Sequence, residues 1–230
     1  MFRIYIHHVA PSRSPVTPHF QPGRETVAMI EAAGGEATFV RADISKAAEV
    51  EALVAEAVAR HGRLDVAFNN AGIGEVSPRL ADLEESDFDR NFNINVRGTF
   101  LCMKYEIKHM LKQGGGAIIN NASIQSHIAI GHSAHYTACK HAILGYTRAG
   151  AVDYAKDNIR INAISPGPVL TAMTSVDPNA PEAAPLLMRI PAGRVGAAEE
   201  IVGAVVFLAS DMASYVHGAS LAIDGGWLAH

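Results

Sequence analysis

The stretch that decides the fold is LDVAFNNAG, which runs from Leu64 to Gly72. Leu64 to Phe68 is a short, mostly apolar run of the kind found in a strand that is buried on both faces. The Asn-Asn-Ala-Gly segment that follows favours a turn, and its glycine lets the backbone approach a planar ligand closely. The stretch therefore predicts a buried parallel strand whose carboxyl end opens into a binding turn.

The same alternation of strand and helix extends along the rest of the chain. Periodicity predicts further strands at residues 37–42, 117–120, 160–164 and 220–223. Helices are expected at residues 25–33, 92–112, 135–155 and 198–208, and a further one, capped by Ser45, carries the apolar stripe of residues 50–58. This order predicts right-handed βαβ units. We expect an α/β fold, with one doubly wound, Rossmann-like domain over residues 23–230.

Polar and turn-forming residues follow several of these strands directly. They are Asp43, the turn at 69–72, Ser123 and the Pro166-Gly167 pair. Ligands of doubly wound sheets bind outside the carboxyl ends of the strands. We therefore expect these residues to line one site.

Tyr136 and Lys140 lie four residues apart in a predicted helix, and Ser123 lies thirteen residues before Tyr136. Positions i and i+4 share a helix face, so the ammonium can approach the phenol and lower its pKa. Such a phenol can act as a general acid or base on an alcohol or carbonyl oxygen. The pair alone also fits a surface lysine after a half-buried tyrosine, so its meaning depends on the rest of the chain.

Taken together, the motifs from Gly23 to Gly226 resemble the short-chain dehydrogenase/reductase family. The resemblance rests on the 69–72 turn, Asn95-Val96-Arg97-Gly98, Ile118 to Ser123, the spacing from Ser123 to Tyr136 and Lys140, Pro166 to Thr171, and Asp224-Gly225-Gly226. It implies that Tyr136 is the acid/base and that Ser123 holds the substrate oxygen. It also implies that Lys140 lowers the tyrosine pKa and binds the nicotinamide ribose, and that Asn95 positions a proton-relaying water.

The resemblance further implies a dinucleotide cofactor, NAD or NADP, with NAD favoured. The residues implied to contact it are Asp43 and Ile44 at the adenine, Asn70, Ala71 and Gly72 beside the cofactor, Tyr136 and Lys140 at the ribose, and Pro166, Gly167, Val169 and Thr171 near the carboxamide. The variable segment from Met173 to Pro191 occupies the place of the substrate lid. A homotetramer is also implied, with Met103, Ile107 and Leu111 as candidate outward-facing residues that could equally face the chain's own sheet.

Residues 1–22 depart from the family pattern. They hold four of the eleven prolines, and the first glycine of the chain is Gly23. A phosphate loop needs glycines so that backbone N–H groups can reach the pyrophosphate. We expect an atypical Pro-rich leader with at most one strand at Phe2–His8, and a first βαβ unit that is incomplete or replaced.

This departure leaves two interpretations open. The first is an NAD(P)-dependent oxidoreductase that interconverts a secondary alcohol and a ketone, with an atypical or misread start. The second is a catalytically impaired, cofactor-deficient member of the family that serves as an assembly or binding subunit.

Composition limits the partners and the compartment. The net charge is -4 over 230 residues, which offers no basic surface for nucleic acid. No apolar run approaches the ~20 residues of a membrane span, and no signal peptide is evident. The two cysteines form no disulfide framework, so a cytoplasmic protein is expected. His127, His132 and His135 lack a carboxylate or cysteine to complete a metal site, and we expect loop histidines at the substrate entrance.

Overall fold

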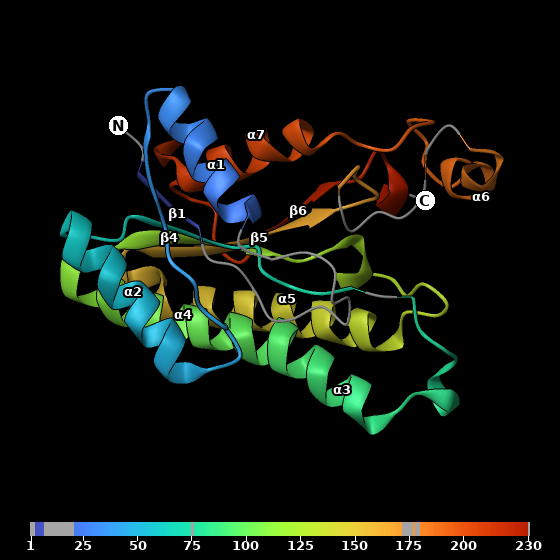
Figure 1. The fold of residues 1–230 in the computed structure, drawn as a ribbon, viewed down its shortest axis with the longest axis horizontal. Coiled ribbons are helices and arrows are strands. Elements are labelled where there is room, and N and C mark those ends of the chain that lie inside the picture. Colours follow the sequence, from blue (N-terminus) through green and yellow to red (C-terminus); the bar gives the residue numbers. More distant parts are fainter. Residues whose placement is uncertain (1–2, 7–20, 75, 172–176, 178–179, 230) are drawn as a thin grey trace.

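A computed structural model describes residues 3–6, 21–74, 76–171, 177 and 180–229 (Figure 1). The central four-stranded sheet has the order β3 (Val66–Asn69), β4 (Gly116–Asn121), β5 (Ile159–Pro166) and β6 (Ser220–Ile223). Each neighbouring pair in it is parallel. The predicted parallel sheet is confirmed, and the strand expected at residues 220–223 has the predicted bounds.

Helices cover both faces of this sheet (Figure 1). On one face lie α1 (Gln21–Ala32) and α7 (Ala198–Ala209), and on the other lie α2 (Ala47–His61), α4 (Gly98–Gln113) and α5 (Ala134–Tyr154). The shorter helices are α3 (Glu85–Asn91) and α6 (Ala184–Leu187). A sheet with helices on both faces is the doubly wound arrangement that the sequence predicts.

The core is divided between the two faces because side chains alternate along each strand. Ile118 and Ile161 pack with residues of α4 and α5, including Met103 and Met110. On the opposite face, Ile119 packs with Leu208 of α7. Strands β4 and β5 are therefore buried on both faces, which explains their nearly continuous apolar sequences.

The N-terminal part contains a separate parallel pair. Strand β1 (Arg3–Ile6) pairs with β2 (Glu36–Phe39), and α1 connects them. The one strand expected near the start is thus confirmed, while residues 7–20 of the predicted leader lie outside the described residues. On β3, Val66 and Phe68 remain 37% and 36% exposed. The prediction that this strand is buried on both faces is therefore wrong, because alternate side chains of β3 remain partly exposed. Among the described residues, β1, α1 and β2 form a parallel βαβ unit that does not pair with β3.

Two local expectations need correction. The helix predicted from residue 92 begins as a π-helical turn, η2 (Phe92–Arg97), which continues into α4. Ser45 does not cap α2, because its hydroxyl donates to Asp43 Oδ1 at 2.7 Å and Lys46 occupies the N-cap without a side-chain bond. Of the two orientations left open for Met103 and Ile107, the structure shows the inward one, since both lie in the core against the sheet.

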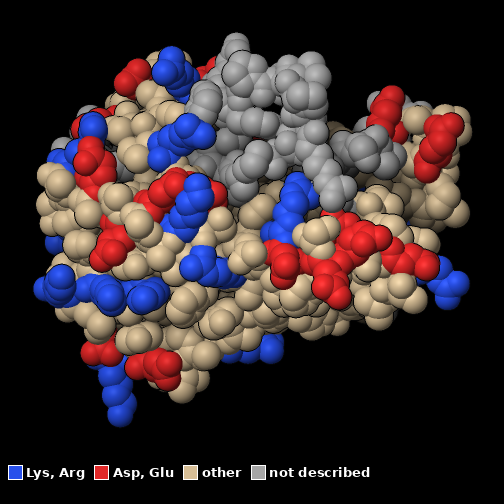
Figure 2. Space-filling view, turned by 60° about the horizontal axis from the view of Figure 1, so that its bottom comes forward, with Lys and Arg blue, Asp and Glu red and all other residues tan. Residues whose placement is uncertain are grey.

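The molecular surface carries charges of both signs. On the face shown in Figure 2, basic and acidic side chains are interspersed among uncharged ones. A mixed surface of this kind creates no extended field of one sign. In the described part of the chain, no helix combines the length and the apolar character needed to cross a membrane.

Candidate active site

Tyr136 and Lys140 lie in the first two turns of α5, as the spacing predicts. The Lys140 ammonium is 5.4 Å from the centroid of the Tyr136 ring. Lys140 is only 4% exposed, and its Nζ donates to the main-chain oxygen of Asn121 at 2.7 Å. The pair is therefore part of an interior site, and the alternative of a surface lysine is excluded.

Ser123 follows β4 directly and lies beside Tyr136. Its backbone is extended, and its Oγ accepts a hydrogen bond from the Gln125 N–H at 3.2 Å. The serine side chain also forms a hydrogen bond with the Tyr136 side chain. The strand end and the helix thus bring together the hydroxyl and the phenol that the sequence placed thirteen residues apart.

The electrostatics of the pair differ from the expectation. Burial raises the pKa of Tyr136 above its ordinary value, and the hydrogen bond with Ser123 opposes that rise only in part. Burial also lowers the pKa of Lys140 to about 8. The expected net lowering of the tyrosine pKa by Lys140 is wrong for this arrangement, because desolvation of the phenol dominates.

Asn95 lies at the wide turn of η2 and is fully buried. Its Nδ2 donates to the main-chain oxygen of Ile73 at 3.0 Å, and its Oδ1 accepts from the Ile73 N–H at 2.9 Å. Thr99 Oγ1 donates to the Asn95 main-chain oxygen at 2.8 Å. The amide therefore holds the loop that follows β3. That Asn95 positions a water stays a prediction.

The loop after β3 packs directly on these residues. A Cβ added to Gly72 would lie 2.7 Å from Asn95 Oδ1 and 3.9 Å from Lys140 Nζ. A Cβ on Gly74 would lie 3.0 Å from the Tyr136 ring. Gly72 is among the residues predicted from the sequence, whereas Gly74 is not, although it is a second glycine only two residues further on. Both glycines allow the backbone to approach Asn95, Lys140 and Tyr136 closely.

Asn70 and Ala71 occupy different environments in the same turn. Asn70 is exposed, and its Oδ1 accepts from Asn121 Nδ2 at 2.6 Å. Ala71 is half-buried and packs against the cluster around Ile44 and Leu101. Asn121 was not singled out from the sequence, yet it links Asn70 to Lys140 through its side chain and its carbonyl.

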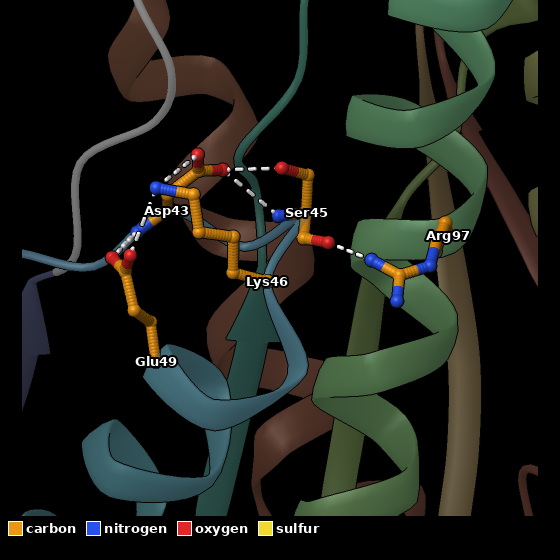
Figure 3. A network of polar contacts seen from close by, with 5 residues as sticks. All are labelled: Asp43, Ser45, Lys46, Glu49 and Arg97. Atoms are coloured by element: carbon orange, nitrogen blue, oxygen red, sulfur yellow. Dashed lines mark hydrogen bonds and ion pairs between the residues drawn. The ribbon is translucent and has the colours of Figure 1, made fainter.

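Asp43 closes a polar network after β2 (Figure 3). Its Oδ1 accepts from the N–H and the hydroxyl of Ser45 at 3.0 and 2.7 Å, and its Oδ2 lies 3.4 Å from Lys46 Nζ. Burial would raise the pKa of Asp43, but the hydrogen bonds from Ser45 and Lys46 outweigh it and lower the pKa. Arg97 donates to the Ser45 carbonyl and ties this network to η2.

The neighbouring Ile44 faces away from this network. It is 1% exposed and packs in the core, where a Cβ on Gly98 would meet it at 2.5 Å. Its side chain therefore cannot touch a cofactor. Only its backbone remains available for the adenine contact that the sequence predicts.

The predicted nicotinamide-side segment leaves the end of β5. Pro166 ends the strand, and the Gly167 N–H donates to the Ile223 carbonyl of β6 at 3.0 Å. A Cβ on Gly167 would lie 2.8 Å from the Asp224 backbone, so the close approach requires glycine. Val169 forms a parallel bridge with Gly196, and Thr171 is exposed. Residues 173–176, 178 and 179 of the predicted lid lie outside the described residues.

The three histidines have separate partners. His127 Nε2 lies 3.2 Å from Ser165 Oγ, and His132 Nδ1 lies 3.1 Å from the Ser77 carbonyl oxygen. His135 packs edge-on against Phe88, with ring centroids 5.8 Å apart. Among the described residues no group of three or more potential ligands is placed to hold a metal ion.

The arrangement fits the nicotinamide half of a dinucleotide. Ser123, Tyr136 and Lys140 converge at the carboxyl edge of the sheet, and the glycines at 72 and 74 leave their backbone against them. The diphosphate half has no glycine-rich cradle among the described residues, since Gly23 is the first glycine of the chain. A site of this composition can exchange a proton with a substrate oxygen.

Known proteins match nearly the whole chain. The family described as "Enoyl-(Acyl carrier protein) reductase" matches residues 17–228. The 2,5-dichloro-2,5-cyclohexadiene-1,4-diol dehydrogenase of Sphingobium indicum is 43% identical over 206 residues, covering 88% of this chain and 82% of that protein. The cis-4-hydroxycyclohexanecarboxylate dehydrogenase of Sinomonas cyclohexanicum is 41% identical over 197 residues, covering 86% and 79%.

A solved structure agrees with these relatives. The gluconate 5-dehydrogenase of Burkholderia cenocepacia, in complex with NADP and tartrate, matches with a TM-score of 0.87 and 30% identity. The match covers 97% of this chain and 85% of that one. Because the match combines 30% identity with coverage of nearly the whole chain, the likeness concerns the family as well as the fold.

The fold and the site define an NAD(P)-dependent oxidoreductase. The chain belongs to the short-chain dehydrogenase/reductase family. The resemblance inferred from the motifs is therefore confirmed, and relatives that are dehydrogenases and reductases over most of the chain do not support the impaired-subunit interpretation.

Proposed function

We propose that this enzyme interconverts a secondary alcohol and a ketone on a small six-membered ring. The observation that carries the proposal is the convergence of Ser123, Tyr136 and Lys140 within one buried site. Two relatives named above act, by their names, on a cyclohexadiene diol and a cyclohexane carboxylate.

An apolar cluster beside Ser123 supports a ring-shaped substrate. Ile124 follows the serine directly and packs in a cluster with Ile190, Val195 and Trp227. Leu186 and Leu187 of α6 pack on the same cluster. Ile124, Ile190, Val195 and Trp227 are themselves buried, so a substrate ring would contact the half-buried members Leu186 and Leu187. Burial of apolar area against these side chains is favourable by about 25 cal/mol per Å². The cluster therefore favours an apolar ring over an open-chain polyol.

The proposed proton steps use this chain's own residues. In the oxidation direction the alcohol proton passes to the Tyr136 oxygen, while the Ser123 hydroxyl holds the substrate oxygen as its negative charge develops. The nicotinamide, when bound, supplies the hydride acceptor or donor. In the reduction direction the Tyr136 hydroxyl returns a proton to the carbonyl oxygen. Lys140 provides the positive charge that stabilises the phenolate during the exchange.

The cofactor contacts are proposed at the residues that the sequence predicts. Gly72 lies against Asn95 and Lys140, Asn70 is linked to Lys140 through Asn121, and Ala71 lies between them in the turn. Pro166 ends β5, and Gly167, Val169 and Thr171 belong to the segment that follows it. Asp43 lies four residues beyond the end of β2, in the segment where the adenine is expected. The preference for NAD over NADP is also a proposal, which parallel titrations with both cofactors would decide.

We further propose a cytoplasmic homotetramer with α4 and α5 at a subunit interface. Phe100 and Tyr146 on these helices are each 40% exposed, and their rings pack 5.8 Å apart. Leu111 of α4 is 43% exposed. Exposed apolar side chains grouped on two adjacent helices are typical of a protein interface. Light scattering on the wild type and on Phe100→Glu would test this, and a monomeric wild type would overturn it.

A kinetic experiment tests the catalytic proposal. The purified chain is assayed with NADH and NADPH against cyclohexane-1,4-dione and, for comparison, an open-chain keto acid. We expect turnover of the ring ketone and its loss by at least ~10³-fold in Tyr136→Phe, because the proton donor is removed. The absence of ring-ketone turnover with both cofactors, or retained activity in Tyr136→Phe, contradicts the proposal.

A further inference from the structure

A buried carboxyl group lies in the core behind the cofactor turn. Glu106 of α4 is 6% exposed, and burial raises its pKa to about 7, with a hydrogen bond from Asn69 opposing the rise. Burying an ionisable group costs free energy unless its partners compensate for it. No step of the proposed chemistry uses this carboxyl group, so its position needs another explanation.

Glu106 is one end of a continuous chain of hydrogen bonds. Asn69 Nδ2 donates both to Glu106 Oε2 at 3.1 Å and to Asn120 Oδ1 at 3.0 Å. Asn120 Nδ2 donates in turn to Thr147 Oγ1 at 2.9 Å. The Thr147 hydroxyl then donates to the Ile143 carbonyl at 2.9 Å. The chain thus joins α4, β3, β4 and α5 through side chains that are all buried.

The two ends of this chain reach the two halves of the site. Asn69 is the last residue of β3, and the turn at residues 70–72 follows it directly. Thr147 lies on α5, the helix that carries Tyr136 and Lys140. The chain therefore connects the proposed cofactor turn with the catalytic helix through the interior of the sheet.

We propose that Glu106 is a positioning residue that fixes the cofactor turn relative to the catalytic helix through Asn69, Asn120 and Thr147. This positioning role rests on the proposed function in one respect only, namely that the ligand of the turn is the cofactor. The geometry itself does not require that function. Both N–H bonds of the Asn69 amide are used by this chain, whereas its Oδ1 has no partner among the described residues. Glu106 thus decides which way the amide points.

Removal of the acceptor has a definite physical consequence. Without Glu106, one Asn69 N–H is left buried and unpaired, which costs about 1–3 kcal/mol. The amide can relieve that cost by rotating, and the rotation also breaks its bond to Asn120. The turn at residues 70–72 then loses its interior attachment.

The titration of Glu106 can be distinguished from the titration of other groups, because the side chains that form hydrogen bonds around it carry no charge. Asn69 from β3 and, behind it, Asn120 and Thr147 from β4 and α5 are uncharged. Cys102 of the same helix is the titratable group that interacts with the carboxyl charge, and burial already raises its pKa. A change in the pH profile near neutrality that disappears in Glu106→Gln is therefore attributable to Glu106.

Three variants of the full-length enzyme test the proposal. Glu106→Leu removes the acceptor, and Glu106→Gln keeps an oxygen acceptor but cannot titrate. Met110→Ala opens the core beside the same helix without removing a member of the chain of hydrogen bonds. We expect Glu106→Leu to raise the cofactor KM about fivefold, the equivalent of one hydrogen bond. Glu106→Gln should restore KM and abolish any inflection near pH 7. Met110→Ala should lower the melting temperature without changing KM.

A second readout separates this proposal from the proposed function. Hydrogen exchange of the amides at residues 70–74 needs no turnover, and we expect faster exchange in Glu106→Leu but not in Met110→Ala. If Glu106→Leu does not fold, Thr147→Val interrupts the chain at its other end and should produce the same change. Equal exchange in the wild type and the interrupted variant, or equal effects of the Leu and Gln variants, would overturn the positioning role even in an active enzyme.

Discussion

The side chain of Asn95 holds the backbone of Ile73 by two hydrogen bonds, one donated at 3.0 Å and one accepted at 2.9 Å. The two residues are 22 positions apart, and the contact fastens the loop after β3 to the π-helical turn η2. Single π-helical turns of this kind occur frequently at functional sites. The loop, Tyr136 and Lys140 therefore share one rigid support.

We expect Asn95→Ala to weaken both stability and catalysis. Two buried hydrogen bonds are lost and the Ile73 groups remain unpaired, which should lower the free energy of unfolding by about 2 kcal/mol. The released loop should lower kcat/KM by about tenfold or more. Urea unfolding and steady-state kinetics measure both effects.

Asn91→Ala is the matched control for this change. Asn91 is also buried, but its Nδ2 donates locally to the Asp87 carbonyl at 2.9 Å. It should cost about 1 kcal/mol of stability while leaving kcat/KM nearly unchanged. Equal kinetic losses in both variants would show that general destabilisation, and not the loop contact, is responsible.

Lys140 should reduce the stability of the fold at neutral pH. Burial lowers its pKa to about 8 from an ordinary 10.5. Below about pH 8 the folded state carries the full cost of the buried cation. Between pH 8 and 10.5 the unfolded chain binds the proton more strongly than the folded one, so stability rises with pH in this window.

We therefore expect Lys140→Met to be more stable than the wild type at pH 7, by about 1–3 kcal/mol, and inactive. The difference should shrink as the pH rises through 8 and should level off above about 10.5, where the lysine becomes neutral in both states. Chemical unfolding of the two proteins at several pH values measures it. A Lys140→Met protein that is less stable than the wild type at pH 7 contradicts the expected burial cost.

Glu106 also makes the stability of the fold depend on pH, in the direction opposite to that of Lys140. Its pKa is about 7 in the folded state against an ordinary 4.5, so between these values the folded state binds a proton that the unfolded chain has lost. The stability contribution of the neutral carboxyl is complete below about pH 4.5 and is lost as the pH rises to about 7. The slope is at most about 1.4 kcal/mol per pH unit.

Glu106→Gln should remove this slope. The difference in unfolding free energy between the wild type and the variant should move in favour of the variant between pH 5 and pH 8. Urea titrations at both pH values provide the measurement, and subtraction cancels the titration of all other groups. A pH-independent difference would mean that Glu106 keeps an ordinary pKa in the folded protein.

The features of the fold and the site that could be predicted from the sequence are those that depend on local periodicity and motif spacing. The alternation of helix and strand located β4, β5, β6 and α5 within one or two residues. For β4 and β5 the reason is that both are buried, mostly apolar runs. The motif spacings placed Ser123, Tyr136 and Lys140 correctly in one site. The pattern of α4 could not show which face meets the sheet, since apolar residues surround much of that helix.

What the sequence did not predict depends on contacts between distant segments. The Asn95–Ile73 contact, the Asn121 link and the hydrogen bonds from Glu106 to Thr147 join residues that only the folded sheet brings together. The sign of the Tyr136 pKa shift also depends on burial of the phenol, which spacing alone does not reveal. Ser45 failed as a cap because Asp43 competes for its hydroxyl.

Gly74 offers the most local test of how the loop supports catalysis. An added Cβ would lie 3.0 and 3.1 Å from two carbons of the Tyr136 ring, and the backbone of Gly74 is outside the left-handed region. Gly74→Ala should therefore fold, with a stability change below about 1 kcal/mol, but it must push the loop and the ring apart by a few tenths of an ångström. We expect kcat to fall by about tenfold, because the phenol is displaced from the substrate oxygen.

Gly203→Ala is the control, since that α7 glycine has open space around it. Its replacement should raise stability by up to about 1 kcal/mol and leave kcat unchanged. If kcat of Gly74→Ala equals that of Gly203→Ala, the ring can move freely, and the loop does not position Tyr136.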